Sequence, residues 1–284
     1  MTQRGVSSQK MLVFARGVSG NAAPSKRLRF SKVYAATAAG KFWAMGPAKG
    51  IRYQPGLYSA SGALIAALPS ATIGVRKDGS FYTLVATYSG IPEECIYVGN
   101  VAIDTYRLRD GKPTLVSSLT LAKPCNVAAV AAGPDGSLYV ATSSVAAHSD
   151  DPQTTRVLHF APGAIGNAKP VSRVYSTYEG GASNTQLAVD SRGNLYLALN
   201  GRVRVYRNGR SPGTYLFDGD AVAIDSQDNV YVVASAYNKT ALRTRLVVRE
   251  YAPGATTPFR TIDGSNTELH IGDGGQYPTI ALVP

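Results

Sequence analysis

The acidic and histidine residues that could bind a ligand or perform acid–base chemistry gather in a few irregular stretches. These stretches are residues 45–50, 88–100, 143–155, 178–186, 235–243 and 263–277. The candidates that we single out in them for a ligand-binding face are Glu93, Glu94, His148, Asp150, Asp151, Glu179, His270 and Asp273. They include two of the three histidines, on a chain whose net charge is +11.

The sequence His148-Ser-Asp-Asp offers ligand types that suit Ca²⁺, Mg²⁺ or Zn²⁺. Its spacing matches no dedicated metal motif, so a solvated polar loop is the favoured interpretation and no cofactor is assigned. His270 and Asp273, in a glycine-rich stretch, are interpreted in the same way. No G-x-S-x-G, H-E-x-x-H or Walker-type phosphate loop is present. The sequence therefore assigns no catalytic residue and leans away from an enzyme.

The two cysteines, Cys95 and Cys125, both fall in expected loops. A disulfide between them would tie down a long loop and indicate an oxidising compartment. Two unpaired small residues are the alternative.

The chain has 29 basic and 18 acidic residues, which invites an acidic partner such as nucleic acid. Arg202, Arg204 and Arg207 alternate along one expected strand, and interleaved tyrosines could stack bases. Alternation places these arginines on outer strands, however, and the acidic loops oppose phosphate. Scattered basic side chains that keep the protein soluble are the favoured interpretation, and nucleic acid is disfavoured.

Five segments repeat around a turn that is followed by an apolar–aromatic pair. They are AAGKFWAM (38–45), KDGSFYTLVA (77–86), PDGSLYVATS (134–143), SRGNLYLALN (191–200) and SQDNVYVVAS (226–235). The aromatic residues of the pairs are Trp43, Tyr82, Tyr139, Tyr196 and Tyr231. Asp-Gly or Gly-Asn between two apolar runs is a strong hairpin signal. The regular place of the aromatic row favours packing between repeats over a sugar-binding platform.

Two further strand-like runs follow each hairpin, at a mean spacing of about 47 residues, which is typical of a four-stranded propeller blade. The N-terminal MLVFARGVSGNAAPSKRL is similar to RVLHFAPGAIGNAKPVSRV at 156–174, the outer half of a blade. The C-terminal YPTIALVP is similar to a first strand. We predict an all-β, six-bladed propeller, a single domain over 1–284, whose closing blade of three or four strands is shared by the N-terminal strands and 279–283.

The pattern AVDSRGNLYLA, followed by FAPGAxGN, resembles the NHL-type and lyase-like bacterial propellers. The resemblance implies the fold, a secreted or surface location, and a site on the face that carries the b–c and d–a loops, where strands a to d run outward from the axis. Gluconolactonase-like propellers hold a metal near the axis. The Glu, Asn and Asp ligands of such a metal site are not evident in this sequence, although Asn126, Asn184 and Asp220 lie near the starts of inner strands. The His–Glu–His arrangement of streptogramin lyase-like propellers is not evident either.

The favoured function is an extracytoplasmic binding or scaffold module that recognises a small ligand, a carbohydrate or a protein partner through the loops at 88–100, 143–155 and 263–277. A metal-dependent lyase or lactonase-type hydrolase using the same face is the main alternative, and an RNA-binding NHL-like propeller is the second. The sequence has no run of 18 apolar residues, so no membrane span is predicted. The N-terminal apolar segment is too short for a signal peptide.

Overall fold

Hairpins form at the five places that the repeat predicts, because each turn supplies a residue that tolerates positive φ. Gly79, Gly136 and Gly193 adopt φ of 80°, 86° and 80°, in the left-handed region that glycine enters without steric penalty. In the fifth turn Asp228 takes the same place with φ of 63°. Each hairpin joins the two inner strands of one antiparallel sheet.

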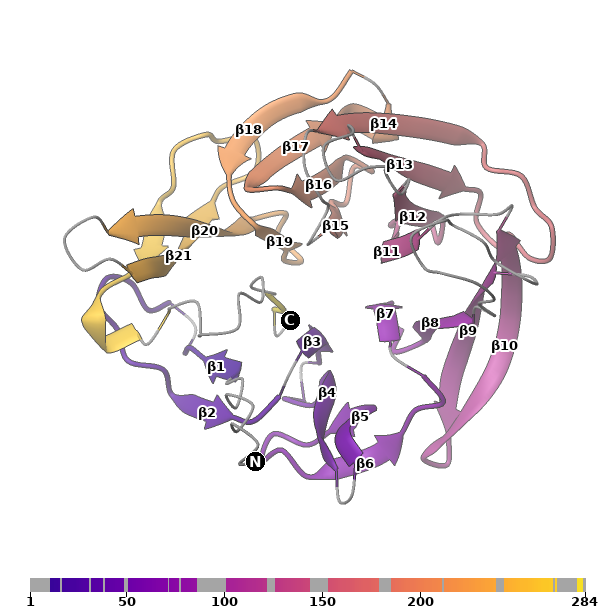
Figure 1. The fold of residues 1–284 in the computed structure, drawn as a ribbon, viewed down its shortest axis with the longest axis horizontal. Helices are drawn as coiled ribbons and strands as arrows, with labels where there is room; N and C mark the ends of the chain where they lie inside the picture. The colour runs from indigo at the N-terminus through magenta and orange to yellow at the C-terminus, as the bar shows by residue number, and fades with distance from the viewer. Residues whose placement is uncertain are drawn as a thin grey trace, which may run out of the picture.

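The computed structural model is an all-β propeller whose four-stranded sheets stand around a common axis (Figure 1). It describes residues 11–15, 17–30, 32–37, 39–48, 51–70, 72–76, 78–85, 101–121, 126–143, 153–178, 185–210, 212–238, 243–267, 269 and 280–282.

Five sheets, numbered as blades in chain order, have four strands each. Blade 1 consists of β3 (Lys32–Ala36), β4 (Phe42–Ala48), β5 (Ile51–Tyr58) and β6 (Leu64–Ala67). Blade 2 consists of β7 (Thr72–Val75), β8 (Phe81–Val85), β9 (Val101–Arg109) and β10 (Lys112–Leu121). Blade 3 consists of β11 (Asn126–Ala132), β12 (Leu138–Ser143), β13 (Gln153–Phe160) and β14 (Ser172–Tyr178).

Blade 4 consists of β15 (Thr185–Val189), β16 (Leu195–Leu199), β17 (Arg202–Tyr206) and β18 (Thr214–Asp218), with the 3₁₀ turn η2 (Arg207–Gly209) between its outer strands. Blade 5 consists of β19 (Ala221–Ile224), β20 (Val230–Asn238), β21 (Arg243–Tyr251) and β22 (Arg260–Ile262), followed by the turn η3 (Ser265–Thr267). The first strand of each blade lies nearest the axis and touches the first strand of the next, from β3 through β19 (Figure 1).

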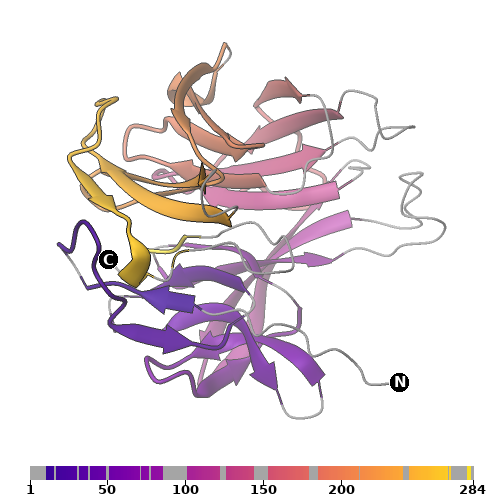
Figure 2. The ribbon, with the colours of Figure 1, turned by 60° about the vertical axis from the view of Figure 1, so that its left-hand side comes forward.

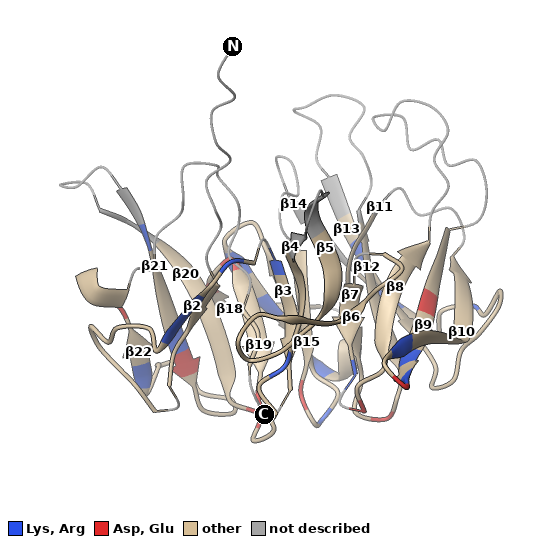
Figure 3. Cartoon of the chain, turned by 90° about the horizontal axis from the view of Figure 1, so that it is seen from below, with Lys and Arg blue, Asp and Glu red and all other residues tan. Residues whose placement is uncertain are grey.

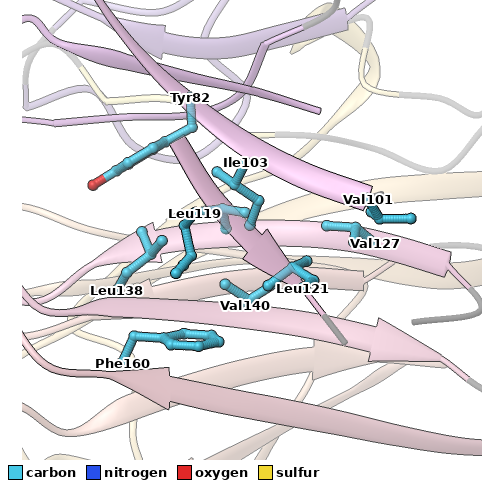
Figure 4. Close-up of a cluster of buried hydrophobic side chains, with 10 residues drawn as sticks. Tyr82, Val101, Ile103, Leu119, Leu121, Val127, Leu138, Val140 and Phe160 are labelled. Atoms are coloured by element: carbon cyan, nitrogen blue, oxygen red, sulfur yellow. The ribbon is translucent and has the colours of Figure 1, made fainter. Parts of the chain in front are cut away.

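Apolar side chains fill the space between successive blades. Between blades 2 and 3, Ile103 and Leu119 from one sheet meet Val140 and Phe160 from the other, all with at most 3% of their surface exposed (Figure 4). Similar clusters join blade 1 to 2, 3 to 4, and 4 to 5. Because each strand alternates its side chains between two neighbours, the core is a series of layers between the sheets rather than one central mass.

The number of four-stranded sheets differs from the prediction of six blades. The described residues form five, together with a two-stranded sheet of β1 (Met11–Val13) and β2 (Lys26–Leu28), which lies between blades 5 and 1 (Figures 1 and 2). Of the expected C-terminal strand, residues 280–282 are described and are not a strand. The side chain of Ile280 instead packs, with Leu269, on the cluster of Ala221, Val233 and Leu246 in blade 5.

The predicted similarity between the N-terminal segment and residues 156–174 extends to their contacts. The loop between β13 and β14 reaches back to blade 2, where the Gly166 amide donates to the Ser118 carbonyl at 2.8 Å. The loop between β1 and β2 reaches blade 5 in the same manner, where the Gly20 amide donates to the Thr261 carbonyl at 2.7 Å. Both contacts form parallel bridges to an outer strand, so β1 and β2 occupy the place of outer strands.

Candidate binding face

Three of the connections between strands leave from the same edge of the ring. They join residues 85 to 101 in blade 2, 143 to 153 in blade 3, and 178 to 185 between blades 3 and 4. These connections meet at one edge because neighbouring strands in every sheet are antiparallel. We call this the loop edge, and the opposite edge, where the inner hairpins turn, the turn edge (top and bottom of Figure 3).

The eight candidates of the predicted ligand-binding face all lie outside the described residues. They are Glu93, Glu94, His148, Asp150, Asp151, Glu179, His270 and Asp273, and the same holds for both cysteines of the predicted disulfide, Cys95 and Cys125. Their roles therefore stay predictions.

At the turn edge, the inner hairpin turns are short and internally bonded. Asp190 accepts hydrogen bonds from the Arg192 and Asn194 amides at 3.0 and 2.8 Å and from the Asn194 side chain at 2.7 Å. Asp225 repeats the pattern with the Gln227 and Asn229 amides, both at 2.9 Å. Carboxylates that satisfy backbone donors in this way fix the turn geometry.

Bonds also join the turns of neighbouring blades. The Ser191 amide and hydroxyl donate to the two carboxylate oxygens of Asp228 at 2.8 and 2.5 Å. Between blades 2 and 3, Arg76 donates to the Gly136 carbonyl at 3.1 Å. These links hold the turn edge in one arrangement.

Acidic residues are not confined to the loop edge. Eleven of the eighteen lie among the described residues. Five of these belong to the inner turns, namely Asp78, Asp135, Asp190, Asp225 and Asp228 (Figure 3). A hydrogen bond from the Ser80 hydroxyl, helped by the Ser80 amide and Arg107, lowers the pKa of Asp78 to about 2. The carboxylates of these inner turns are thus part of the scaffold.

The aromatic row lies in the core between blades, as the sequence predicts. Trp43, Tyr82, Tyr139 and Tyr196 are at most 6% exposed. Tyr231 is half-buried, and its hydroxyl donates to Glu250 Oε1 at 2.7 Å. Burial, reinforced by Glu250 and Asp225, raises the pKa of Tyr231. Glu250 Oε2 also forms an ion pair with Arg260 Nη1 at 2.8 Å. Tyr231, Glu250 and Arg260 therefore form a polar cluster that links strands of blade 5.

His159 is a strand residue in β13, as predicted. Its ring stacks on Tyr139 with centroids 4.3 Å apart, and its Nδ1 lies 3.2 Å from Ser172 Oγ. Burial lowers the pKa of His159, an effect that Asp135 opposes. The residue therefore packs as a neutral ring.

Within the ranges that the structure describes, no three His, Cys, Asp or Glu side chains gather in a way that would hold a metal ion. Asp220 directly precedes β19, and its carboxylate accepts a hydrogen bond from the Ser235 hydroxyl. Asn126 begins β11, while Asn184 is not described. The described residues also contain no helix that is long and apolar enough to cross a membrane.

A polar row that the sequence reading missed crosses blade 2 near the loop edge. Thr72, Thr83 and Asp104 are cross-strand neighbours on three successive strands. They face blade 1, because Thr83 and Asp104 lie on the same side of the sheet as Phe81 and Tyr106, which pack against blade 1.

The two threonine hydroxyls of this row have no hydrogen-bond partner, and the residues are 1% and 0% exposed. In every other blade the pair at this position is apolar: Val33 and Ala44, Val130 and Val140, Leu187 and Leu197, Val222 and Val232. An alignment of the repeats by strand register would have revealed the exception.

Lys32, on the facing strand of blade 1, lies opposite this row. It pairs with Met45, on the side of β4 that carries Trp43 toward blade 2. Its Nζ sits 5.4 Å from the centre of the Tyr34 ring. Lys32 is an exposed residue, although desolvation by neighbouring protein lowers its pKa. No described carboxylate forms an ion pair with it.

Comparison with solved structures gives the same architecture. A protein of unknown function from Bacteroides caccae superposes with a TM-score of 0.54 at 13% identity, covering 97% of this chain and 98% of that one. A luciferin-regenerating enzyme superposes with a TM-score of 0.46 at 14% identity, covering 91% of this chain and 81% of its own. At these identities the first likeness shows the fold alone.

No family model matches the chain. No curated protein matches it either. The resemblance to NHL-type propellers therefore stays a prediction from the repeat.

Proposed function

We propose that the chain is a β-propeller binding module that recognises a ligand or protein partner through its loop edge. The observation that carries this proposal is the contrast between the two edges. Inter-turn bonds such as Ser191 to Asp228 lock the inner turns of the turn edge, whereas the connections at 86–100, 144–152 and 179–184 leave from the loop edge. Residues on connections between rigid strands tolerate variation, which suits recognition.

The candidates of the proposed face are those of the predicted loops, with Glu93, His148, Asp150 and His270 foremost. Their carboxylates and imidazoles would supply hydrogen-bond acceptors around the axis. The proposal includes an extracytoplasmic location, which follows from the disulfide that the sequence predicts between Cys95 and Cys125. Mass spectrometry before and after reduction tests the bond, since a disulfide withholds both thiols from alkylation.

The binding proposal is tested with two variants of blade 3. One replaces residues 144–152, which join β12 to β13, by Asn-Gly. The matched control inserts a glycine–serine segment of the same length between Asp135 and Gly136, at the turn edge of the same blade. A panel of organic acids, sugars, divalent cations and peptides is screened by thermal shift, and titration calorimetry measures the hits.

We expect a hit whose affinity falls in the loop variant and is retained in the control. Binding that is lost only in the control would place recognition at the turn edge and overturn the proposal.

We further propose that β1 and β2 are the outer half of a sixth blade that closes the ring. The equivalent bridges of Gly20 and Gly166 to neighbouring outer strands support it. So do contacts on both sides: Met11 and Leu28 contact the Phe30, Phe42 and Tyr58 cluster of blade 1. On the blade 5 side, the Asp263 backbone amide donates to the Gly20 carbonyl at 2.9 Å.

A further inference from the structure

The positive charge of the chain is concentrated on the outer strands of consecutive blades. We call the two outer strands of a blade, with the connection between them, its outer half. Basic residues outnumber acidic ones by three or four in each of four outer halves that follow one another around the ring, namely 153–178, 202–218, 243–262 and 11–30. We call these four segments the basic arc.

The rest of the ring is close to neutral. Basic residues exceed acidic ones by one in each of the outer halves of blades 1 and 2, at 51–67 and 101–121. The inner halves of the five blades range from an excess of two acids to an excess of two bases. The net charge therefore follows one part of the rim, from blade 3 through blade 5 to β1 and β2.

Several cations of the basic arc are exposed. Arg202, Arg207 and Arg210 in blade 4, Arg173 in blade 3 and Lys26 in β2 are all exposed. None of the five forms an ion pair with a described carboxylate. Figure 3 shows basic segments of β2 and β22 at the rim. Like charges so gathered repel one another, which an anionic partner would relieve and which solubility alone does not require.

The shape of the basic arc narrows the choice of anion. A small ligand would contact a single blade, and a flat membrane touches only one sector of a ring. Double-stranded nucleic acid is stiff, with a persistence length of about 150 base pairs, so bending it around one small domain is costly. A flexible linear polyanion can follow the rim and contact several blades at once.

The side chains of the basic arc indicate the chemistry of this polyanion. The four segments contain thirteen arginines and two lysines, and the guanidinium fork binds a planar carboxylate through two parallel hydrogen bonds. Tyr215 and Phe259 are 47% and 54% exposed. The guanidinium carbons of Arg202 and Arg260 lie 5.8 and 5.5 Å from the centres of these rings. Each pair offers an apolar face for a sugar ring beside a cation for its carboxylate.

We propose that the basic arc binds a linear polysaccharide of uronic acids along the rim, from blade 3 to β1 and β2. Each contact is weak, but once one sugar is bound the next sits at high effective concentration, so the contacts add. Single-stranded nucleic acid is the less suitable polyanion, because it uses successive aromatic platforms and the described part of the arc exposes two aromatic rings. The proposal goes beyond the binding face at the loop edge, since none of the loop candidates belongs to the arc.

The probe is polygalacturonate, compared with monomeric galacturonate and with poly(U) RNA. Calorimetry measures binding to the full chain at neutral pH, first at low salt and then at about 0.15 M salt, where the screening length is about 8 Å. The test variant combines Arg202→Gln, Arg207→Gln and Arg210→Gln. A second variant, Lys26→Gln with Arg29→Gln and Arg173→Gln, removes exposed charges elsewhere on the arc.

The matched control combines Lys41→Gln, Arg109→Gln and Lys112→Gln. These residues are exposed and lie in blades 1 and 2, outside the basic arc, and their replacement changes the net charge by the same amount. Thermal unfolding confirms that each variant is folded.

We expect polygalacturonate to bind the natural chain more weakly as salt rises, and the monomer to show no binding at the same carboxylate concentration. Each test variant should weaken polymer binding by roughly five- to ten-fold, because three exposed charge contacts are lost, and the control should retain it. No polymer binding at low salt, or equal losses in the test and control variants, would overturn the proposal. Tighter binding of poly(U) than of polygalacturonate at about 0.15 M salt would assign the arc to nucleic acid instead.

The variant lacking residues 144–152 separates this proposal from the one for the loop edge. It keeps every cation of the basic arc and should bind polygalacturonate as the natural chain does. Loss of polymer binding in this variant would place the polysaccharide at the loop edge and refute the arc. Polymer binding without any loop-dependent ligand would support the arc and remove the proposed binding face.

Discussion

At Thr83 a hydroxyl is buried with no partner where the equivalent residues are Ala44, Val140, Leu197 and Val232. On folding, this hydroxyl loses its hydrogen bonds to water and gains none in the protein. We predict that Thr83→Val raises the free energy of unfolding of the ligand-free chain by about 1–3 kcal/mol, the range for an unsatisfied buried polar group. Urea unfolding measures it.

The control is Thr142→Val, where the Thr142 hydroxyl donates to the Arg156 carbonyl at 3.4 Å. That variant loses a bond and should gain no stability. A loss of stability in Thr83→Val would show that the hydroxyl is satisfied within the protein.

Asp78 gives the turn edge a pH dependence whose sign is fixed by its lowered pKa. The Ser80 hydroxyl, then the Ser80 amide and Arg107, hold the folded-state pKa at about 2, below the usual 3.8. The ionised carboxylate therefore stabilises the fold fully above pH 4, and this contribution is lost as the pH falls toward 2.

We predict that Asp78→Asn is less stable than the natural chain at pH 7, and that the two converge between pH 4 and pH 2. The side chain is largely solvent-exposed, so the difference should shrink with salt. Denaturant unfolding across this range checks it. A difference that does not change with pH would rule out the carboxylate charge as its source.

Asp228 combines an unfavourable backbone conformation with a useful side chain. Its φ of 63° suits glycine, yet its carboxylate receives both donors of Ser191 from the adjoining blade. We predict that Asp228→Ala is less stable than Asp228→Gly by about 1 kcal/mol, because both lose the carboxylate but only alanine keeps the left-handed strain. Equal stabilities in thermal unfolding would contradict this.

At the scale of elements, the sequence predicts what is local. The Asp-Gly and Gly-Asn turns indicate three of the five inner hairpins, since the turn residues determine the φ values that such hairpins need. The burial of Trp43 and Tyr139 follows from their regular place. The Thr72–Thr83–Asp104 row and the opposition of Lys32 depend on strand register and on neighbouring blades, which no single segment encodes. The loop candidates could be named as residue types but not placed.

The loop between β1 and β2 contacts blade 5 through the Gly20 backbone and also through the Asn21 side chain. The Asn21 side chain accepts from the Asn266 amide at 2.7 Å, which joins segments 245 positions apart in sequence. We predict that Asn21→Ala lowers the free energy of unfolding by about 0.5–1.5 kcal/mol, the net contribution of one hydrogen bond.

Asn167→Ala is the matched control, because Asn167 occupies the same place after Gly166 and is exposed. It should leave stability unchanged in chemical unfolding. Equal losses in the two variants would mean that Asn21 acts only within its own loop.

At the scale of the whole molecule, closure decides whether the ring behaves as one cooperative unit. Five four-stranded sheets leave one face of blade 1 and one face of blade 5 to be covered. Met11, Val13 and Leu28 cover the first by packing with Phe30, Phe42 and Tyr58. Leu269 and Ile280 cover the second. An uncovered sheet face or edge would expose apolar surface and free backbone groups that promote association.

We predict that removing residues 1–30 lowers the unfolding temperature and causes self-association, because it exposes the blade 1 cluster and the outer edge of β22. Removing residues 1–10 is the control, since β1 and β2 then remain. Calorimetry reports the transition and light scattering the mass. If the chain without residues 1–30 stayed monomeric and unfolded at the same temperature as the full chain, β1 and β2 would not be needed for closure. The ring would then close through blades 5 and 1 alone.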